Sequence, residues 1–312
     1  MSGTIDRIIV SVSSLEESLA FYRDWAGMKV RGEEDLSPEE LVGLYGLSSK
    51  TSAHSVYLFN SLQETLIELV QFKPMTGKPV RKKGKDWDYG IYDICFLVEG
   101  VDAIYKSLTD KGFGAVHAPV EYNPLGDPVK EAVIIGPDNT HLAHLQRVTS
   151  PLKDSLGRYI SIADSAQIVP DMGEALNFYR GIVGMSLINR ITLPPGTLDD
   201  ILGVPKKTRA ELAFVGRPAS REPMVVLINL SVPGKHLAEA AWPPNLGVCA
   251  ISFEVPNLSN LVAAVKGAGY KVISGPADIR KAIYGRMRAV MVSGPAGVMV
   301  EFLERWPTSP SR

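Results

Sequence analysis

Short apolar runs and amphipathic stretches follow one another along the chain in a recurring order. Apolar residues at three- and four-residue steps indicate helices, and short runs rich in Val, Ile and aromatic residues indicate strands. Near the N-terminus the pattern predicts a strand at 8–12, a helix at 15–25, and strands near Val30, at 55–59 and at 65–72. Gly27 follows the predicted helix, as a left-handed helix cap requires.

The same order of elements returns in the next part of the chain. The pattern predicts a strand at 91–98, a helix at 101–111, and strands near Val116, at 131–135 and at 141–146. Both stretches therefore read as a β-α-β-β-β motif.

The chain also repeats itself on a longer scale. Residues 15–28 and 172–185 share the sequence Phe-Tyr-Arg followed by Gly-Met, and the second stretch begins 157 positions after the first. Other pairs, such as Lys50-Thr51 and Lys207-Thr208, keep the same spacing. A constant spacing over most of the chain indicates homologous domains. We expect one domain at 1–150 and a second at 151–312, each with two β-α-β-β-β motifs.

Composition and charge exclude several classes of protein. Hydrophobic residues make up 45% and charged residues 21%, which is typical of a globular chain. Lys and Arg number 33 against 34 Asp and Glu, so binding to nucleic acid by phosphate neutralisation is not expected. No apolar run approaches the roughly 20 residues that span a bilayer. No secretory signal is evident, and Cys95 and Cys249 lie in apolar runs typical of buried free thiols, so we expect a cytoplasmic protein without membrane partners.

Three segments resemble the vicinal oxygen chelate superfamily, which includes glyoxalases, extradiol dioxygenases and bleomycin-resistance proteins. They are SLEESLAFYRDWAGM at 14–28, MGEALNFYRGIVGM at 172–185 and GPAGVMVEFLE at 294–304. The resemblance covers almost the whole chain and implies the two-domain form. It implies an α+β fold in which four tandem βαβββ motifs form two half-open barrel domains. The function is less specific, because this superfamily supports many chemistries.

In this family the first and last strands of each motif direct metal-binding His and Glu side chains into the barrel. The resemblance places those stations at Arg7, Glu68, Asp93 and Ala143 in the first domain, and at Asp164, Asn229, Ala250 and Glu301 in the second. Only Glu68 and Glu301 match the family residue, and no station carries a histidine. An extradiol dioxygenase or an ordinary glyoxalase is therefore not expected.

The substituted stations leave alternatives open. Arg7, neutralised by Glu68 or Asp93, is either an organic replacement for the metal or a structural ion pair in an inactive barrel. Asp164, Asn229 and Glu301 supply oxygen atoms, which suits Mg²⁺ or Mn²⁺ if water completes the shell. The alternative is a hydrogen-bonded polar patch that orients an organic ligand. The cofactor is thus unknown: none, or a divalent cation.

Other polar residues can reach the predicted cavities. Strand alternation favours an inward His141, a candidate general base, against the reading of a satisfied strand histidine. His54 lines a cavity only if its strand keeps the assumed register. Tyr284 and Arg288 can bind a carboxylate, phenolate or enolate, unless they face solvent. Aromatic residues at 87, 89 and 92 form either an apolar ligand wall or part of the core.

Acidic stations favour an enzyme, because a binding module has little need to bury unpaired acids. We expect a lyase or isomerase that transfers a proton next to a carbonyl or phenol oxygen. The candidate catalytic residues are Glu301, Asp164, Glu68, His141 and Tyr284, and the candidate substrate-binding residues are Arg7, Asp93, His54, Asn229 and Arg288. The alternatives are a metal-free sequestering protein and an Mg²⁺- or Mn²⁺-dependent enzyme. The expected partner is a small aromatic or alicyclic molecule with oxygen substituents, and a homo-oligomer is left open.

Overall fold

The computed structural model describes residues 3–60, 62–63, 65–81, 86–124, 126–149, 158–199, 201–218 and 220–306. The predicted join near residue 150 lies outside these residues.

The first two motifs follow the predicted order of elements. The first comprises β1 (Ile5–Ser11), α1 (Leu15–Leu19) continuing into the π-helical turn η1 (Ala20–Trp25), β2 (Lys29–Asp35), β3 (Ser52–Phe59) and β4 (Leu66–Lys73), with α2 (Pro38–Gly43) between β2 and β3. The short β5 (Gly90–Ile91) leads into the second, which comprises β6 (Ile94–Val98), α3 (Val101–Asp110), β7 (Gly114–Tyr122), β8 (Val129–Ile135), η2 (Pro137–Asn139) and β9 (His141–Arg147).

The last two motifs repeat this order. The third comprises β10 (Tyr159–Ile168), α4 (Met172–Asn177) continuing into η3 (Phe178–Val183), β11 (Ser186–Leu193), β12 (Ala210–Arg217) and β13 (Ser220–Leu230). The fourth comprises β14 (Gly247–Glu254), α5 (Leu258–Gly267), β15 (Lys271–Lys281), β16 (Gly285–Ser293), η4 (Pro295–Gly297) and β17 (Met299–Arg305). Four βαβββ motifs confirm the predicted α+β class.

Local sequence sets the ends of the helices. The Ser14 hydroxyl accepts a hydrogen bond from the backbone N–H of Glu17 at the start of α1, and Asp171 does the same for Glu174 at α4. Gly184, with φ of 81°, ends the third-motif helix in the left-handed region, where glycine carries no steric penalty.

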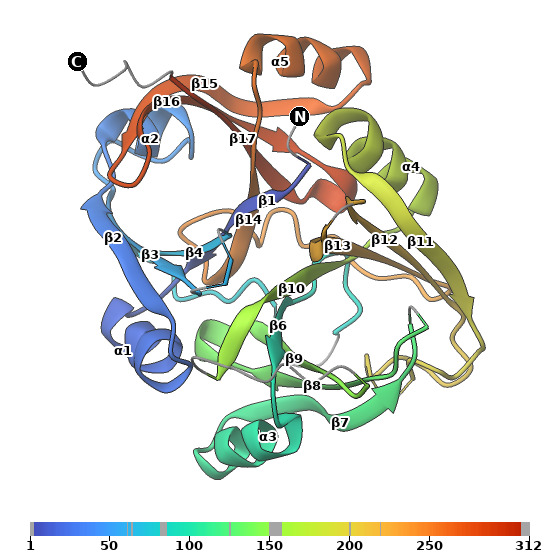
Figure 1. Cartoon of the computed structure of the whole chain (residues 1–312). Coiled ribbons are helices and arrows are strands. Elements are labelled where there is room, and N and C mark those ends of the chain that lie inside the picture. The colour runs from blue at the N-terminus through green and yellow to red at the C-terminus, as the bar shows by residue number, and fades with distance from the viewer. Residues whose placement is uncertain are drawn as a thin grey trace.

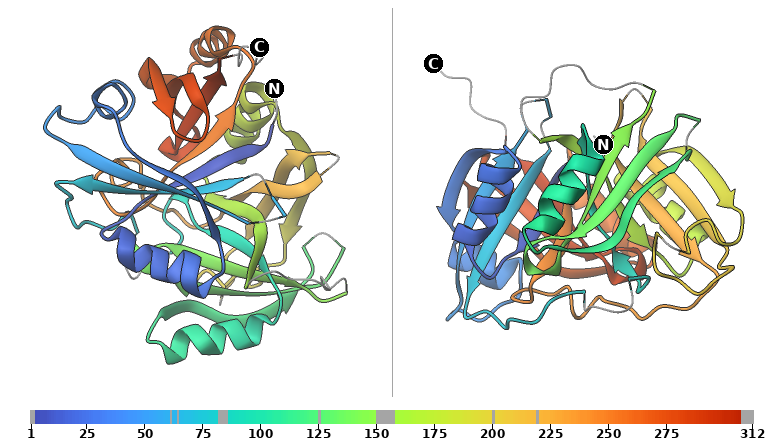
Figure 2. Two further views of the ribbon diagram at one scale, coloured as in Figure 1. Left: turned by 60° about the vertical axis from the view of Figure 1, so that its left-hand side comes forward. Right: turned by 90° about the horizontal axis from the view of Figure 1, so that it is seen from below.

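Each sheet combines motifs from both halves of the chain. One sheet has the order β15-β16-β17-β14-β1-β4-β3-β2 and joins the first motif to the fourth; we call it the outer-motif barrel. The other has the order β11-β12-β13-β10-β6-β9-β8-β7 and joins the second motif to the third; we call it the inner-motif barrel. Figure 2 shows the blue strands of the first motif beside the red and orange strands of the last.

This topology corrects the predicted grouping of the stations. Arg7 and Glu68 share a barrel with Ala250 and Glu301, instead of with Asp93 and Ala143. The reason is the pairing of first strands: β1 runs antiparallel to β14, with Ile9 opposite Ala250. Four motifs of one pattern present equivalent first strands, so the repeat alone does not determine which motifs pair. The 1–150 and 151–312 boundary stays a prediction about homologous halves.

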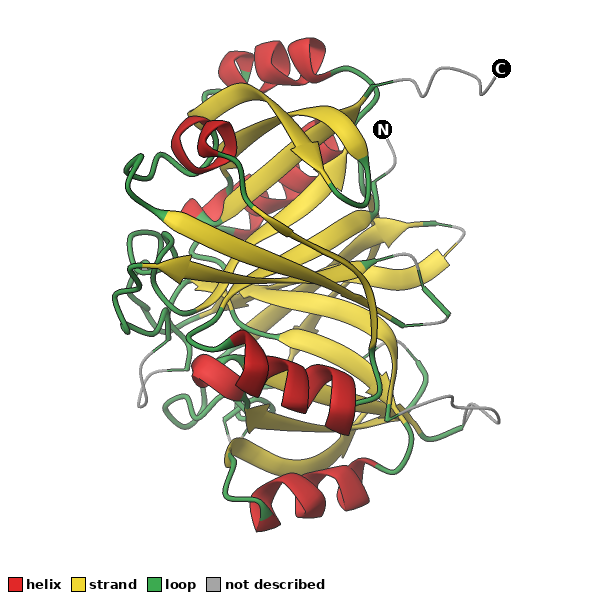
Figure 3. Ribbon diagram, turned by 90° about the vertical axis from the view of Figure 1, so that its left-hand side faces the viewer, coloured by secondary structure: helices red, strands yellow, loops and turns green. Residues whose placement is uncertain are grey.

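Strand alternation divides the side chains between two faces. On β1, Ile8 and Val10 join the apolar cluster that also includes helix residues such as Phe21, whereas Ile9 joins a separate cluster inside the outer-motif barrel. The helices that follow the first strand of each motif accordingly lie on the outer faces of the sheets, at the periphery of the molecule (Figures 1 and 3). The concave faces are left for the two barrel interiors.

The outer-motif barrel is closed across its open side. A Cβ added to Gly32 on β2 would lie 3.0 Å from Ile283 of the β15–β16 hairpin, so these edges are in close contact. The backbone N–H of Ala282 donates to Glu34 on β2 at 2.7 Å. Helix α2 packs against β15 and completes the closure.

Among the described helices, none combines the length and apolar character that crossing a lipid bilayer demands.

The crossed pairing generates a prediction about the two halves of the chain. Residues 1–150 and 151–312, produced separately, leave β1 and β6 without their native partners β14 and β10. We expect each half alone to expose apolar sheet edges and aggregate, and the two halves together to form one native heterodimer. Circular dichroism and size-exclusion chromatography measure this. A single half that folds as a stable monomer would contradict the prediction.

Candidate functional site

The outer-motif barrel contains a guanidinium group held between carboxylates. Arg7 Nε donates to Glu68 Oε2 at 2.6 Å, Arg7 Nη1 donates to Asp6 Oδ2 at 3.0 Å, and Arg7 Nη2 donates to Glu301. Arg7, Glu68 and Glu301 are fully buried. Two serines support the acids: Ser55 donates to Glu68 at 2.9 Å, and Ser252 donates to Glu301 at 2.6 Å.

A second buried cation completes this network. Lys281, at the end of β15 and fully buried, contacts Glu68 Oε1 at 3.0 Å and also Glu40 of α2. Burial alone would raise the pKa of Glu68, but the charges of Lys281 and Arg7 outweigh it and lower the pKa to about 2. Glu68 is therefore an ionised structural acid that joins strands β1, β4 and β15.

The outer-motif barrel does not fit the metal that the superfamily implies. Its four stations are Arg7, Glu68, Ala250 and Glu301, and the Arg7 guanidinium hydrogen-bonds to both carboxylates. A divalent ion there would add positive charge beside a fixed cation, and none of the four stations carries an imidazole to bind it. Apolar side chains such as Phe72 and Met291 fill the rest of the interior. Of the two readings of Arg7, this geometry favours the structural ion pair.

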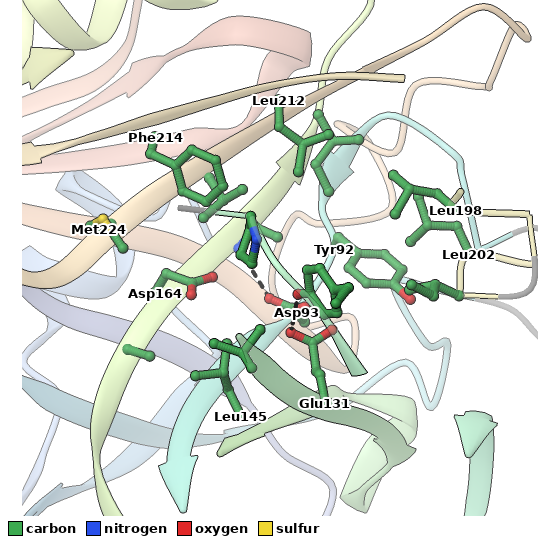
Figure 4. A pocket seen from close by; sticks show the side chains of 18 of the residues that line it. Tyr92, Asp93, Glu131, Leu145, Asp164, Leu198, Leu202, Leu212, Phe214 and Met224 are labelled. Atoms are coloured by element: carbon green, nitrogen blue, oxygen red, sulfur yellow. Dashed lines mark hydrogen bonds between the residues drawn. The ribbon is translucent and has the colours of Figure 1, made fainter. Parts of the chain in front are cut away.

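The inner-motif barrel, in contrast, encloses a cavity of about 120 Å³. Its apolar wall comes mainly from β12, β13 and the segment between β11 and β12, and its polar wall comes from the segment between β5 and β6 and from β8 and β10 (Figure 4). The apolar residues include Leu145, Leu198, Leu202, Leu212, Phe214 and Met224. A comparable apolar cavity of about 150 Å³ admits benzene.

Three carboxyl groups point toward the same part of this cavity: those of Asp93, Glu131 and Asp164 (Figure 4). Asp93 Oδ1 accepts a hydrogen bond from the backbone N–H of Ala166 at 3.0 Å. Glu131 Oε2 accepts one from the Tyr122 hydroxyl at 2.8 Å. Asp93 and Glu131 are thus each held in place by a neighbouring strand while remaining on the cavity wall.

Burial makes Asp93 and Glu131 weak acids, and we call these two residues the acid pair. Burial raises the pKa of Asp93 to about 7, although the Ala166 hydrogen bond and the charge of Arg81 oppose the rise. Burial also raises the pKa of Glu131 to about 7, and the negative charge of Asp93 raises it further. Near neutral pH the pair therefore carries a proton, and one carboxyl group can donate while the other accepts.

The histidines of this barrel are neutral. His141 is buried, contacts the Tyr92 ring at 5.1 Å between centroids, and lies 3.5 Å from Asp86. Burial and the charge of Arg81 lower the pKa of His141 to about 3. His144 bonds to the Tyr159 hydroxyl at 2.7 Å, and burial lowers its pKa to about 3 as well. Neither histidine lines the cavity.

Other predicted site residues lie elsewhere. Tyr284 donates to Asp6 at 2.9 Å beside the Arg7 network. Arg288 faces Asp278 at 3.5 Å at the exposed β15–β16 edge, and His54 pairs with Asp35 at 2.8 Å on an exposed edge. These residues do not join the cavity. Of the predicted aromatic wall, Tyr92 lines the cavity, while the Tyr89 ring meets the His236 ring edge to face.

The predicted oxygen-donor metal set is not formed. Asp164 and Asn229 lie in the inner-motif barrel, whereas Glu301 lies in the outer-motif barrel bound to Arg7. Asn229 donates to the carbonyls of Val169 and Pro170, both at 2.9 Å, and so caps the end of β10. Within the part of the chain that the structure describes, no three His, Cys, Asp or Glu side chains gather as metal ligands do.

Glu131 and Tyr122 were missed at the sequence level. Strand alternation carried a usable signal: on β8, Ala132 and Ile134 join the helix-side cluster, and Val133 joins the concave one. Glu131 shares the face of Val133 and therefore points into the barrel. The predicted stations came from the first and last strands of each motif, and β8 is the third strand of its motif.

Comparison with known proteins identifies the family. The family model described as the Glyoxalase/Bleomycin resistance protein/Dioxygenase superfamily matches residues 4–124 and 161–302. The chain therefore belongs to this superfamily, which confirms the resemblance of its motifs. A search of curated proteins finds no matching sequence.

Solved structures show the same fold. Glyoxalase I from Zea mays matches with a TM-score of 0.65 at 15% identity, over 96% of this chain and 92% of that chain. A candidate dioxygenase from Bacillus subtilis matches with a TM-score of 0.58 at 12% identity, over 98% of this chain and 86% of that chain. At these identities the likeness establishes the fold alone.

The Arg7 network generates a stability prediction. Arg7→Met leaves the buried Glu301 without its cation and Glu68 with Lys281 alone, and we expect a loss of about 3–5 kcal/mol in the free energy of unfolding. Replacing both acids by glutamine in the same chain should restore part of the loss. Urea denaturation measures each variant.

The matched control is Arg23→Met, which removes an ion pair with Asp24 in which both side chains are exposed. That change should cost less than about 1 kcal/mol. Equal effects of the two arginine substitutions would show that the Arg7 network adds nothing beyond a surface pair.

The raised pKa of Glu131 generates a pH prediction. A folded pKa of about 7 against an ordinary value of 4.5 means that the folded state holds the proton more tightly. The stability this contributes is complete below the ordinary value and is lost as pH rises through 7. Glu131→Gln should therefore reduce the fall in stability between pH 5 and pH 8 by on the order of 3 kcal/mol.

The matched control for this measurement is Glu121→Gln, at an exposed position on the adjacent strand β7. Urea unfolding of both variants and the parent at the two pH values makes the comparison. A Glu131→Gln variant with the parent's pH dependence would show that this carboxyl group titrates normally.

Proposed function

We propose that the inner-motif barrel holds the active site of a proton-transfer enzyme, a lyase or isomerase acting next to a carbonyl or phenol oxygen. The observation that supports this most directly is the pair of Asp93 and Glu131 on the wall of an apolar cavity, each with a pKa of about 7. A general acid or base is most effective when its pKa lies near the working pH.

The pair supplies both roles that such a reaction needs. The ionised carboxylate removes a proton from a carbon next to the substrate carbonyl, and the electron pair of that C–H bond forms a C=C bond as the carbonyl electrons move to oxygen. The protonated partner donates its proton to that oxygen. Return of a proton at a different carbon gives an isomer, and departure of a leaving group from the adjacent carbon gives an elimination.

The other candidates divide according to the barrel in which they lie. Asp164 adds a third carboxyl group to the cavity wall, with the Cys95 thiol as a hydrogen-bonding neighbour. Glu68, Glu301 and Arg7 belong to the closed barrel, so we propose a structural role for them. The substrate is a single-ring compound, because the cavity is close in size to one that holds benzene.

We also propose a cytoplasmic location. Cys95 and Cys249 are both buried free thiols, which is the state that a reducing compartment maintains.

Deuterium exchange tests the proposed chemistry. In D₂O, the protein should accelerate exchange of the α-protons of cyclohexanone or cyclopentanone, which proton NMR follows. Glu131→Gln and Asp93→Asn should each reduce the enzyme-dependent rate by about 100-fold or more, the usual contribution of a general acid or base.

One control variant and two contrary outcomes define the test. Glu121→Gln, outside the cavity, should exchange at the parent's rate. Exchange that both cavity variants retain in full would contradict the assignment of the acid pair, and the absence of any enzyme-dependent exchange over a series of ring ketones would contradict the proposed reaction.

A further inference from the structure

The two members of the acid pair meet hydrogen-bonding groups of different kinds. A group that can only donate favours an ionised carboxylate, and a group that can only accept favours a protonated carboxyl group. Asp93 Oδ1 accepts a hydrogen bond from the backbone N–H of Ala166 at 3.0 Å. A backbone N–H has no lone pair to offer, so this contact favours the ionised form of Asp93. The charge of Arg81 acts in the same direction.

The neighbours of Glu131 can receive a proton. Its Oε2 accepts from the Tyr122 hydroxyl at 2.8 Å, and a hydroxyl that turns round can instead accept from a protonated Glu131. Its Oε1 lies 3.9 Å from Nε2 of His117 on β7. Whether that nitrogen carries a hydrogen or a lone pair therefore decides which form of Glu131 it favours.

The other nitrogen of His117 fixes the tautomer. Nδ1 lies 2.8 Å from the carbonyl oxygen of Ala118, which can only accept, so Nδ1 carries the hydrogen. Burial lowers the pKa of His117, so the ring is neutral at pH 7. Nε2 therefore presents a lone pair. Among the described residues this buried nitrogen has no hydrogen-bond partner.

An irregular stretch of β7 places His117 on the concave side of the sheet. β7 is an edge strand, and its register against β8 shifts on both sides of His117. His117 lies opposite Val133, which belongs to the concave apolar cluster. Paired residues on neighbouring strands share a face, so the imidazole lies on the same side of the sheet as Glu131. Such irregularities often redirect a side chain beside an active site.

Other charges act on Glu131 through space. The titratable and charged groups that face it are Tyr92, Asp93 and Cys95 on or before β6, His117 and Tyr122 on β7, Asp127 before β8, Arg147 on β9 and Asp164 on β10. The negative charge of Asp93 raises the pKa of Glu131, as expected when two carboxyl groups share one proton. The hydrogen bonds at each carboxyl group then determine which member keeps that proton.

From this geometry we infer that His117 is a positioning residue that keeps the shared proton on Glu131, which makes Glu131 the general acid and Asp93 the general base. This inference rests on the proposed function and assigns its two roles. A protonated Glu131 can donate from Oε1 to Nε2 after a shift of about 1 Å, whereas an ionised Glu131 would face the lone pair.

The assigned roles define one path for the protons. When a substrate binds, the Glu131 proton turns from Nε2 to the substrate oxygen, and the O–H bond of Glu131 breaks as that of the enol forms. Asp93 receives the proton from the substrate carbon and returns it at the end of an isomerisation, when Glu131 recovers its own. His117 exchanges no proton with the substrate.

NMR of the parent protein tests the placement of the proton without any substrate. Carbon-13 spectra of the side-chain carboxyl groups should show Asp93 ionising at least about one pH unit below Glu131. Nitrogen-15 spectra should show His117 neutral, with its hydrogen on Nδ1, from pH 5.5 to pH 8. Glu131 ionising first, or a His117 with its hydrogen on Nε2, would overturn the inference.

His117→Phe removes the lone pair and keeps a planar ring. Glu131 loses an acceptor for its proton and should ionise about one pH unit lower. In the ketone exchange measurement, the fall in rate at high pH should move down by the same amount, whereas the rise at low pH, which Asp93 sets, should stay in place. A purely structural loss would lower the rate at every pH and leave both limbs where they are, which would contradict the inference.

The matched control is His236→Phe. His236 is exposed, and its Nδ1 also lies near a backbone carbonyl, that of Ala296 at 3.3 Å, but it does not line the cavity. This variant should keep both limbs of the parent's pH profile. Equal shifts in the two variants would show that the effect does not come from the contact between His117 and Glu131.

The outcomes separate this inference from the proposed function. Asp93 ionising before Glu131, without any exchange of ring ketones, would retain the placement of the proton and reject the proposed reaction. Exchange that depends on both acids, in a protein whose Glu131 ionises first, would retain the reaction and reject the assigned roles.

Discussion

The arrangement of this protein depends on one buried cation, the guanidinium of Arg7, bound to carboxylates from two other strands. Glu68 comes from β4 and Glu301 from β17, so the contact connects the first motif of the chain to the last. A buried guanidinium is tolerable only with its partners in place, because each unpaired ion would cost several kcal/mol. Pairing of the first motif with the fourth therefore requires these opposite charges to meet. The network also occupies the barrel interior, where a ligand would otherwise lie.

The two barrels share a fold and differ in how their buried charge is balanced. In the outer-motif barrel Arg7 and Lys281 face the acids, and they lower the pKa of Glu68 to about 2. In the inner-motif barrel the acids face apolar side chains, and burial raises the pKa of Asp93 and Glu131 to about 7. Glu68 is therefore fixed as an ion in one barrel, whereas Asp93 and Glu131 are able to exchange a proton in the other.

The sequence predicted the elements and motifs well because hydrophobic periodicity is local. It also placed Asp93 and Asp164 in a barrel interior, since strand alternation needs only the correct register. The motif pairing depends on contacts between β1 and β14, which are distant in sequence and which four similar motifs leave undetermined. Glu131 was missed because the family pattern directed attention to first and last strands. The grouping of Glu301 with Asp164 and Asn229 was wrong for the same reason as the pairing, since its partner Arg7 comes from the other end of the chain.

The acids of the inner-motif barrel also explain why the molecule combines a barrel closed by ion pairs with a barrel that keeps a cavity. Keeping Asp93 and Glu131 on an apolar wall destabilises the fold as pH rises through 7, because both become buried anions. The barrel that carries them must be held by interactions elsewhere. Strand β10, the first strand of the third motif, pairs with β6 and β13. Tyr159 of β10 stacks on Phe96 of β6 with 4.1 Å between ring centroids. That aromatic contact lies on the helix side of the sheet, away from the acids, so its contribution to stability does not depend on the protonation of Asp93 and Glu131.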